Sequence, residues 1–231
     1  MTRKRTTGPR VGGVIGHALH AGPRPDARVD WDGWIAAGFA IGSACFFVGP
    51  FPGFVQLVGQ GADSIVFFVG SVFFTVAAAL ELREGTLRQH RRFSDASWWS
   101  AAIKFLGTLF FNASTFHAMQ TGLSTHEQNR LVWGPDLLGS GCFLASGLLA
   151  YGATTGGRRM AGINLAGCVL FMIAAVASFV LPSTGSVLAL APVNWGTALG
   201  ALCFFIGAVL LWRGHAPHDS ACVQPLQPKE V

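Results

Sequence analysis

The sequence predicts an all-α, polytopic membrane protein, a bundle of six transmembrane helices. Residues of the apolar set AVILMFWYC make up 51% of its 231 residues and charged residues only 12%, about half the charged share of soluble domains. The apolar residues gather in stretches near the roughly 20 residues that cross a bilayer as a helix. This composition makes the lipid bilayer the expected partner. It excludes a soluble domain, a disordered chain and a nucleic-acid-binding module, despite a formal net charge of +5.

The apolar stretches are separated by short polar loops with helix-ending residues. Pro50 and Pro52 close the first stretch, Pro182 closes the fifth, and a Gly-Gly-Arg-Arg turn at 156–159 separates the fourth from the fifth. Helices are favoured over strands because lipid offers no hydrogen-bond partner to an open backbone. We expect spans at 33–50, 64–82, 98–118, 135–154, 160–181 and 190–212.

The basic residues predict the orientation. Fourteen of the sixteen Lys and Arg residues lie in the two terminal tails and in the loops after the second and fourth spans, whereas Arg130 is on the other side and Lys104 is inside the third span. Because basic loops stay cytoplasmic, both termini are expected in the cytoplasm. The excess of Arg over Lys, with abundant Ala and Gly, suggests a bacterial inner membrane.

The chain is expected to have one membrane domain between two tails. Residues 1–30 are predicted to be a disordered basic cytoplasmic tail, because they lack the apolar core of a cleaved signal peptide. Residues 31–213 form the six-helix domain, and 214–231 form a short cytoplasmic tail.

A short motif recurs once in every predicted span. A Gly is followed four residues later by a Phe, and the residue directly after the Gly is small. At about 3.6 residues per turn the Gly and the Phe share one helix face, where Gly admits a neighbouring backbone. The predicted helix-packing residues are Gly42 and Phe46, Gly70 and Phe74, Gly107 and Phe111, Gly139 and Phe143, Gly167 and Phe171, and Gly200 and Phe204.

The motif suggests an internal duplication. Its Gly-to-Gly spacings are 28 and 37 in the first three spans and 28 and 33 in the last three, which favours a 3+3 inverted repeat of the kind found in transporters. Pairwise duplication is one alternative, and a Gly- and Phe-rich composition alone is another. The Gly-rich faces of the first and last spans either join these helices within one chain or form a homo-oligomer interface.

Polar residues inside the spans are the candidate functional residues, because each is costly in lipid. Glu81 and Lys104 lie at similar depth, so an ion pair between them is expected, and Asp136 lies near the opposite mouth. The candidate polar path consists of Lys104, Thr108, Asn112, Thr115, Glu81 and Asp136.

Each of these residues also has a structural interpretation. The stripe on the third span can consist of interhelical hydrogen bonds. Glu81 and Lys104 can clamp two helices together. Asp136, after Pro135, suits the N-terminus of a helix.

No catalytic residue, cofactor site or metal site is predicted, and the protein is not expected to be an enzyme. The sequence has no nucleophile elbow, phosphate-binding loop, dinucleotide fingerprint or zinc-binding His pair. The five Cys residues form no CxxC pair and suit apolar packing.

The central third of the chain carries a resemblance. The segments FFVGSVFF at 67–74, FLGTLFFNASTF at 105–116 and VWGPDLLGSGCF at 132–143 resemble bacterial, often actinobacterial, membrane proteins with a YrhK-like domain, over about residues 64–152. The resemblance implies helix pairs with Gly-Ser and Phe-Phe signatures. It supplies no catalytic or binding residues.

Two functions are compatible with these observations. The first is a transporter or channel for a small solute or ion, with an interior lined by the polar residues. The second is a structural or signalling membrane protein whose Gly/Phe faces pack against each other or a partner. A water-accessible groove along Thr108, Asn112 and Thr115 would favour transport, and a dry core would favour the second class.

Overall fold

The computed structural model describes residues 31–87, 95–154 and 156–215, so the predicted tail at 1–30 and most of that at 214–231 lie outside the described residues. Within the described ranges the protein is all-helical, with one isolated β-bridge between Val180 and Val187. The predicted all-α class is therefore confirmed.

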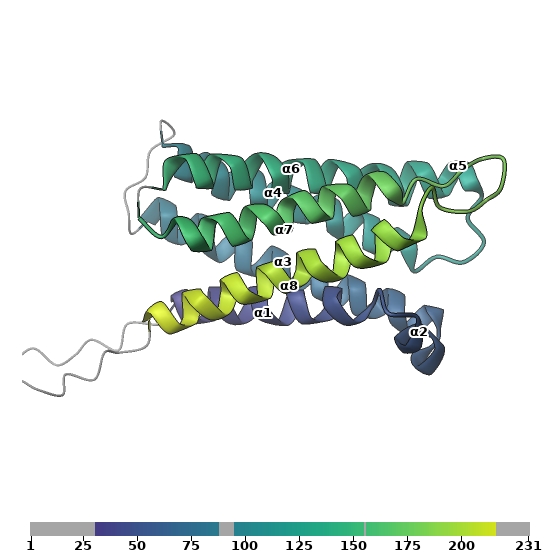
Figure 1. Ribbon diagram of the computed structural model, residues 1–231, viewed down its shortest axis with the longest axis horizontal. Coiled ribbons are helices and arrows are strands. Elements are labelled where there is room, and N and C mark those ends of the chain that lie inside the picture. Colours follow the sequence, from purple (N-terminus) through teal and green to yellow (C-terminus); the bar gives the residue numbers. More distant parts are fainter. Residues whose placement is uncertain (1–30, 88–94, 155, 216–231) are drawn as a thin grey trace, which may run out of the picture.

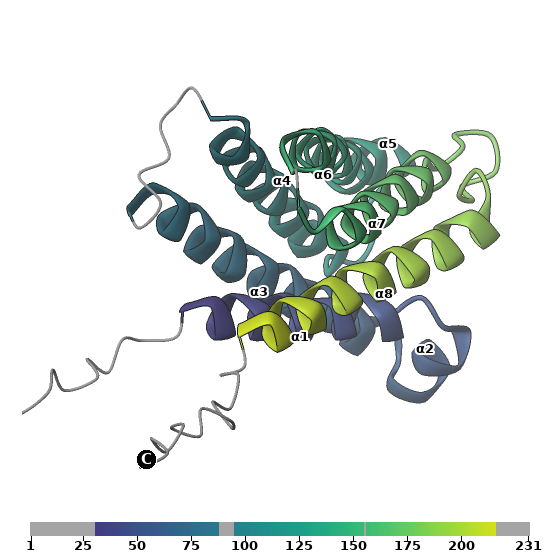
Figure 2. The same cartoon turned by 60° about the vertical axis from the view of Figure 1, so that its left-hand side comes forward.

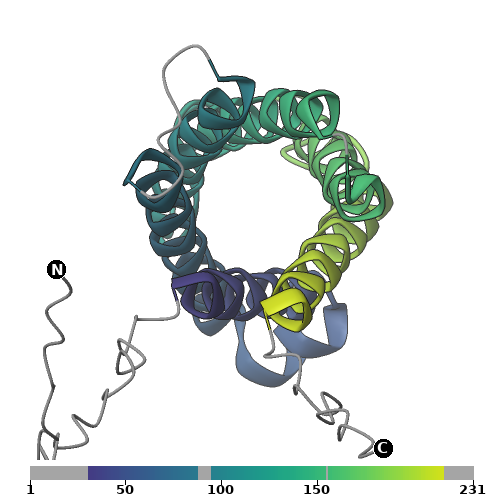
Figure 3. The same ribbon diagram turned by 90° about the vertical axis from the view of Figure 1, so that its left-hand side faces the viewer.

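Six long helices form a closed ring (Figure 3). Each packs against the next one along the chain, and α8 packs against α1 to close the ring. Short helices α2, α5 and η1 lie at one end of it (Figure 1). The helices are α1 (Trp31–Val48), α2 (Pro52–Val58), α3 (Gln60–Leu87), α4 (Ala96–Ala118), α5 (Thr125–Glu127), η1 (Gln128–Trp133), α6 (Gly134–Ala153), α7 (Arg158–Ala177) and α8 (Leu190–His215).

The two ends of the ring differ. At one end α1 begins, α8 ends, and the chain passes from α3 to α4 and from α6 to α7 (Figure 1). We call it the basic end, because Arg83, Arg158, Arg159 and Arg213 belong to its helix termini. The far end carries α5, η1, the 178–189 loop and α2, which projects away from the ring (Figure 2).

Five helices of the described chain are long and apolar enough to span a membrane. They are Trp31–Val48, Gln60–Leu87, Thr125–Ala153, Arg158–Ala177 and Leu190–Gly214. The predicted third span, 98–118, corresponds to α4, which is not among these five: it is 23 residues long but carries three Ser, two Thr, one Asn and one Lys. Six spans are therefore not confirmed by length and composition.

The predicted fifth span, 160–181, extends too far, because α7 ends at Ala177. Beyond it, the Asn129 side chain accepts a hydrogen bond from the Val180 N–H at 2.9 Å and donates one to the Val180 carbonyl at 2.7 Å. These bonds satisfy the backbone of Val180 outside a helix, so the chain turns before Pro182.

The helix containing Asp136 begins earlier than expected. The α5 helix, η1 and α6 run on without a break, and the Gly134 N–H donates to the Asn129 carbonyl in a widened π-type turn. Such a turn accommodates Pro135, which has no N–H and would crowd the carbonyl of a regular helix. Pro135 and Asp136 lie in the first turn of α6, as predicted, but η1 directly precedes that turn.

The Gly/Phe motif joins the helices in pairs, which we call hairpin 1 (α1 and α3), hairpin 2 (α4 and α6) and hairpin 3 (α7 and α8). A Cβ added at Gly42 would lie 3.0 Å from the Phe74 ring, and one added at Gly70 would lie 3.0 Å from the Phe46 ring. The same reciprocal contact joins Gly107 with Phe143 and Gly139 with Phe111, and Gly167 with Phe204 and Gly200 with Phe171. Each Gly thus receives the Phe of its partner helix.

The six Phe rings fill the centre of the ring of helices. Phe46, Phe111 and Phe171, from the first helices of the hairpins, form a triangle with centroids 6.0–6.3 Å apart. A second triangle, from the second helices, has centroids 5.7–6.2 Å apart and consists of Phe74, Phe143 and Phe204. Contacts of 5.0–5.5 Å within each hairpin join the triangles. We call these six residues the Phe plug.

Small residues complete each layer of the plug. Because the two helices of a hairpin are antiparallel, the small residue that follows the Gly on one helix lies level with the Phe of the other. All six small residues are at least 96% buried: Ser43, Ser71, Thr108, Ser140, Cys168 and Ala201. Large and small side chains therefore alternate around the ring, which lets them interdigitate without voids.

The order of the helices bears on the predicted repeat. Since the helices follow the chain around the ring, rotation about the ring axis carries each hairpin onto the next. An inverted copy of three helices would run around the ring in the opposite sense. The 3+3 inverted repeat is therefore not confirmed.

Candidate functional site

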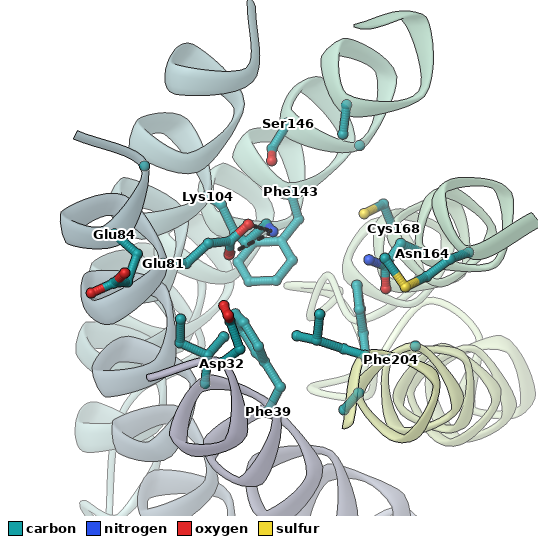
Figure 4. Close-up of a pocket in the computed structure, with 18 residues that line it drawn as sticks. Asp32, Phe39, Glu81, Glu84, Lys104, Phe143, Ser146, Asn164, Cys168 and Phe204 are labelled. Atoms are coloured by element: carbon teal, nitrogen blue, oxygen red, sulfur yellow. Dashed lines mark hydrogen bonds and ion pairs between the residues drawn. The ribbon is translucent and has the colours of Figure 1, made fainter. Parts of the chain in front are cut away.

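The axis of the ring holds a cavity of about 230 Å³ between the basic end and the Phe plug. Phe143 and Phe204 form part of its floor (Figure 4). Its polar wall is contributed by five helices and consists of Asp32, Glu81, Glu84, Lys104, Ser146 and Asn164. We call it the basic-end cavity.

The predicted ion pair is present in this cavity. Lys104 Nζ on α4 donates to both carboxylate oxygens of Glu81 on α3, at 2.9 and 3.0 Å (Figure 4). The ammonium also lies 5.5 Å from the centroid of the Phe39 ring. Because both side chains remain partly exposed to the cavity, the pair forms part of its surface as well as tying two helices together.

A second, smaller cavity lies on the other side of the plug. Its volume is about 50 Å³, and Phe46, Phe111 and Phe171 form one wall. Its polar lining consists of Asp136, Ser140, Ser178 and Thr197. We call it the far-end cavity. Glu81 and Asp136 thus line different cavities, on opposite sides of the Phe plug.

Equivalent positions of the three hairpins line both cavities. The residue seven positions before the motif Phe, two helical turns away, faces the axis in every long helix. On the first helices these residues, Phe39, Lys104 and Asn164, line the basic-end cavity. On the second helices Asp136 and Thr197 line the far-end cavity, and the equivalent Phe67 contacts the Phe46 ring at 5.3 Å.

These axial positions differ chemically from one hairpin to the next. Both are aromatic in hairpin 1, both are charged in hairpin 2, and both are neutral and polar in hairpin 3. The packing positions, in contrast, keep the same Gly, Phe and small residues. The three hairpins therefore share a scaffold and differ where they face the cavities.

Composition and charge alone do not single out Phe39, Asn164 or Thr197 as site residues. The signal present in the sequence is their fixed position seven residues before the motif Phe. It is found only by counting back from that Phe in every span. Within the described part of the chain the Asn164 side chain makes no hydrogen bond, and its amide faces the basic-end cavity (Figure 4).

The polar stripe of α4 does not form the expected groove. Thr108, Asn112 and Thr115 line neither cavity, and Thr108 is completely buried. Asn112 donates to the Thr75 hydroxyl at 2.9 Å, and Thr115 lies 3.0 Å from the Ser71 hydroxyl. Most of the stripe therefore faces α3 rather than the ring axis, and its residues join α4 to α3.

Together with the ion pair, these contacts form a polar ladder between α3 and α4. Its rungs are Ser71 with Thr115, Thr75 with Asn112, Glu81 with Lys104, and Thr86 with Trp98. Ser100 and Ser146 make a comparable reciprocal tie between α4 and α6. The polar content that lowers the hydropathy of α4 is thus largely satisfied by its neighbours.

No group of three or more His, Cys, Asp or Glu side chains suited to a metal ion occurs in the described ranges. No family model matches the chain, and no curated protein or solved structure matches it. The function therefore has to be argued from the two cavities and the plug.

Proposed function

We propose that this protein is an integral membrane transporter or channel that moves a small solute or ion along the axis of its helix ring. The observation that carries the proposal is the pair of cavities on that axis, one on each side of the Phe plug, each with charged and neutral polar side chains in its wall. An aromatic barrier between two polar compartments is the arrangement expected for a closed path with a hydrophobic gate.

The outer surface of the ring supports placement in a membrane. Large apolar side chains are exposed on all the long helices, among them Ile41, Val72, Leu106, Leu148, Ile173 and Leu202. Such extended apolar exposure is unusual for a soluble monomer and suits contact with lipid. In this arrangement α4 also spans the membrane, with its polar side chains turned toward α3 and α6. The basic end of the ring faces the cytoplasm.

The six-helix ring also supports two finer proposals. The reciprocal Gly/Phe contacts favour descent from a duplicated helix pair rather than from a group of three helices. The resemblance to YrhK-like membrane proteins, which implies helix pairs, agrees with the hairpin packing. Since the Gly faces of α1 and α8 are used within the ring, association with a second copy would need another surface.

The rival proposal is a structural or signalling membrane protein. The buried Phe plug favours it, and so do Thr108, Asn112 and Thr115, which line neither cavity. None of these features leads water through the molecule. The rival proposal leaves the polar walls of the two axial cavities without a role, since a purely structural ring could fill these positions with apolar side chains.

Flux into liposomes tests the proposal. Protein reconstituted at known orientation is assayed with a panel of inorganic ions and small polar solutes. Phe143→Ala removes one side of the plug, and we expect at least about a tenfold rise in flux over wild type, equivalent to about 1.4 kcal/mol of barrier. Phe143→Leu, a smaller perturbation of the core, guards against loss of folding.

The matched control is Phe116→Ala, which removes the same side chain from the half-exposed outer surface of α4. Its flux should equal that of wild type.

Access to the basic-end cavity is measured separately. Cys168, which lines this cavity, is kept as the single cysteine of the protein. A small thiol reagent should modify it from the basic end only. Absence of flux in all variants, with Cys168 unreactive from both sides, would favour the structural rival.

A further inference from the structure

The far-end cavity holds a carboxylate without a basic neighbour. Asp136 on α6 shares it with the hydroxyl-bearing residues Ser140, Ser178 and Thr197, contributed by α6, the end of α7 and α8. No Lys, Arg or His lines it. A carboxylate taken out of water without a partner cation costs several kcal/mol, so its surroundings favour a bound cation.

The size of the cavity limits what this cation can be. A volume of about 50 Å³ compares with the roughly 10–15 Å³ of such space that a cavity needs to hold one water molecule. There is space for a small ion with a few water molecules. Its donors are all oxygen, which suits hard cations. One carboxylate balances a single positive charge, whereas calcium sites usually supply more oxygen ligands and more charge.

A second carboxylate lies on the approach from the far end. A groove of about 500 Å³ between α2, α3 and α8 is lined by Asp63, Gln56, Gln60 and Asn194. Asp63 is only 8% exposed, and its Oδ1 atom has no hydrogen-bond partner among the described residues. Burying a carboxylate oxygen without a hydrogen-bond partner raises the free energy of the folded protein. A cation that enters the groove can offset this cost.

The groove and the far-end cavity adjoin. Val193 and Thr197 line both, so the two residues form the boundary between them. No Lys, Arg or His lines the groove either. The far-end side of the plug therefore carries two carboxylates without a lining cation, Asp63 in the groove and Asp136 next to the plug.

We infer that the far-end cavity is a site for a hard monovalent cation, with the Asp136 carboxylate as its anionic ligand and Ser140, Ser178 and Thr197 as neutral oxygen ligands, filled through the groove past Asp63. This inference rests on the proposed function, since it names the class of ion that the axial path takes up. Sodium is the probe cation, because hard oxygen ligands suit it.

Thermal unfolding of the purified protein in detergent tests the site without any flux. The midpoint is measured in choline chloride and in sodium chloride at equal ionic strength. With sodium in large excess over its dissociation constant, we expect a rise of about 3 °C or more in the sodium salt. Asp136→Asn should abolish the rise, and Thr197→Val should reduce it while Thr197→Ser retains it.

The matched control is Asp95→Asn, the same change at an exposed position at the basic end, which should leave the sodium effect intact. If Asp136→Asn does not fold, the contrast between Thr197→Val and Thr197→Ser decides. A sodium effect that survives Asp136→Asn would overturn the inference. So would stabilisation by acidification alone, with no difference between sodium and choline, since the cavity would then hold a proton.

This test separates the two proposals. A sodium effect that depends on Asp136 in a protein that transports nothing would leave the site standing and remove the proposed function. Flux through Phe143→Ala with no sodium effect would do the reverse.

Discussion

The six motif glycines set how closely the helices of each hairpin approach. At Gly107 an added Cβ would lie 2.8 Å from the Phe143 ring, 2.9 Å from the Cys142 Cβ and 3.1 Å from the Gly139 carbonyl. Two of these three atoms belong to backbone or to a Cβ, which cannot swing aside. Each motif Gly is therefore a contact residue, and its role does not depend on a special backbone conformation.

Gly107→Ala should destabilise the protein by about 1–3 kcal/mol, the usual cost of an overpacked core. The measurement is the thermal midpoint in detergent. The control is Gly152→Ala on α6, where an added Cβ meets nothing within 4 Å, so stability should stay the same or rise slightly. Equal effects of the two substitutions would contradict the close-packing argument.

The Glu81–Lys104 pair makes a second prediction at this scale. Glu81→Lys or Lys104→Glu alone places like charges at 3 Å and should lower stability by roughly 1–3 kcal/mol, since the pair is partly screened by the cavity. The double exchange should recover at least half of the loss. A double variant no more stable than either single variant would show that the pair contributes nothing.

The residues that line the axis were only partly predictable from the sequence. Glu81, Lys104 and Asp136 stand out because charge is rare in an apolar helix. Asn164 and Thr197 do not, because a neutral polar residue is common near helix ends. The sequence periodicity of α4 shows which residues share a face. It does not show which face meets α3 and which meets the ring axis, because that depends on where the neighbouring helices lie.

At the scale of elements, the helices were predictable from apolar run length, and their ends were less so. A proline is a strong terminator, so the sequence predicts a fifth span that runs up to Pro182. The helix ends instead at Ala177, and Asn129, 51 positions before Val180 in the chain, bonds both backbone groups of Val180 just beyond that end. The π-type turn before Pro135 was also missed, since helical periodicity has no signature for one extra residue in a turn.

Asn129→Ala tests this anchor between η1 and the 178–189 loop. Two hydrogen bonds to Val180 are lost and its backbone groups are left without partners, so we expect about 1–3 kcal/mol of destabilisation. Hydrogen exchange should become faster at the Val180 amide. Thr184→Ala, at the exposed tip of the same loop, should change neither quantity. Unaltered exchange at Val180 in Asn129→Ala would contradict the assignment.

At the scale of the whole molecule, the ring is a cycle of three hairpins. Each motif contact lies within one hairpin, and α1 and α8 meet at the closing position. Since α1 begins and α8 ends at the same end of the ring (Figure 3), the chain order has no structurally privileged start. The sequence predicts this equivalence only in part, because the linear spacing between motifs does not reveal which helices become neighbours.

A circular permutant tests the cycle. Residue 231 is joined to residue 1, and the chain is opened within 88–94, so that hairpin 2 comes first and all three hairpins stay intact. It should insert and unfold cooperatively, with a midpoint within about 10 °C of wild type. The control is opened at 119–124, which splits hairpin 2 and places both new termini at the far end. That permutant should fail to assemble, and equal behaviour of the two would contradict the hairpin unit.

The Phe plug also has a consequence for the electric field. If water fills the cavities on either side, each face of the plug is held near the potential of its own bath. The membrane voltage then falls mainly across two layers of aromatic rings, a small part of the roughly 30 Å hydrocarbon thickness. Moving one elementary charge through 100 mV corresponds to about 2.3 kcal/mol, and here that work would be concentrated at a single step. Opening the plug would therefore make current depend on voltage at the layer where the six rings meet.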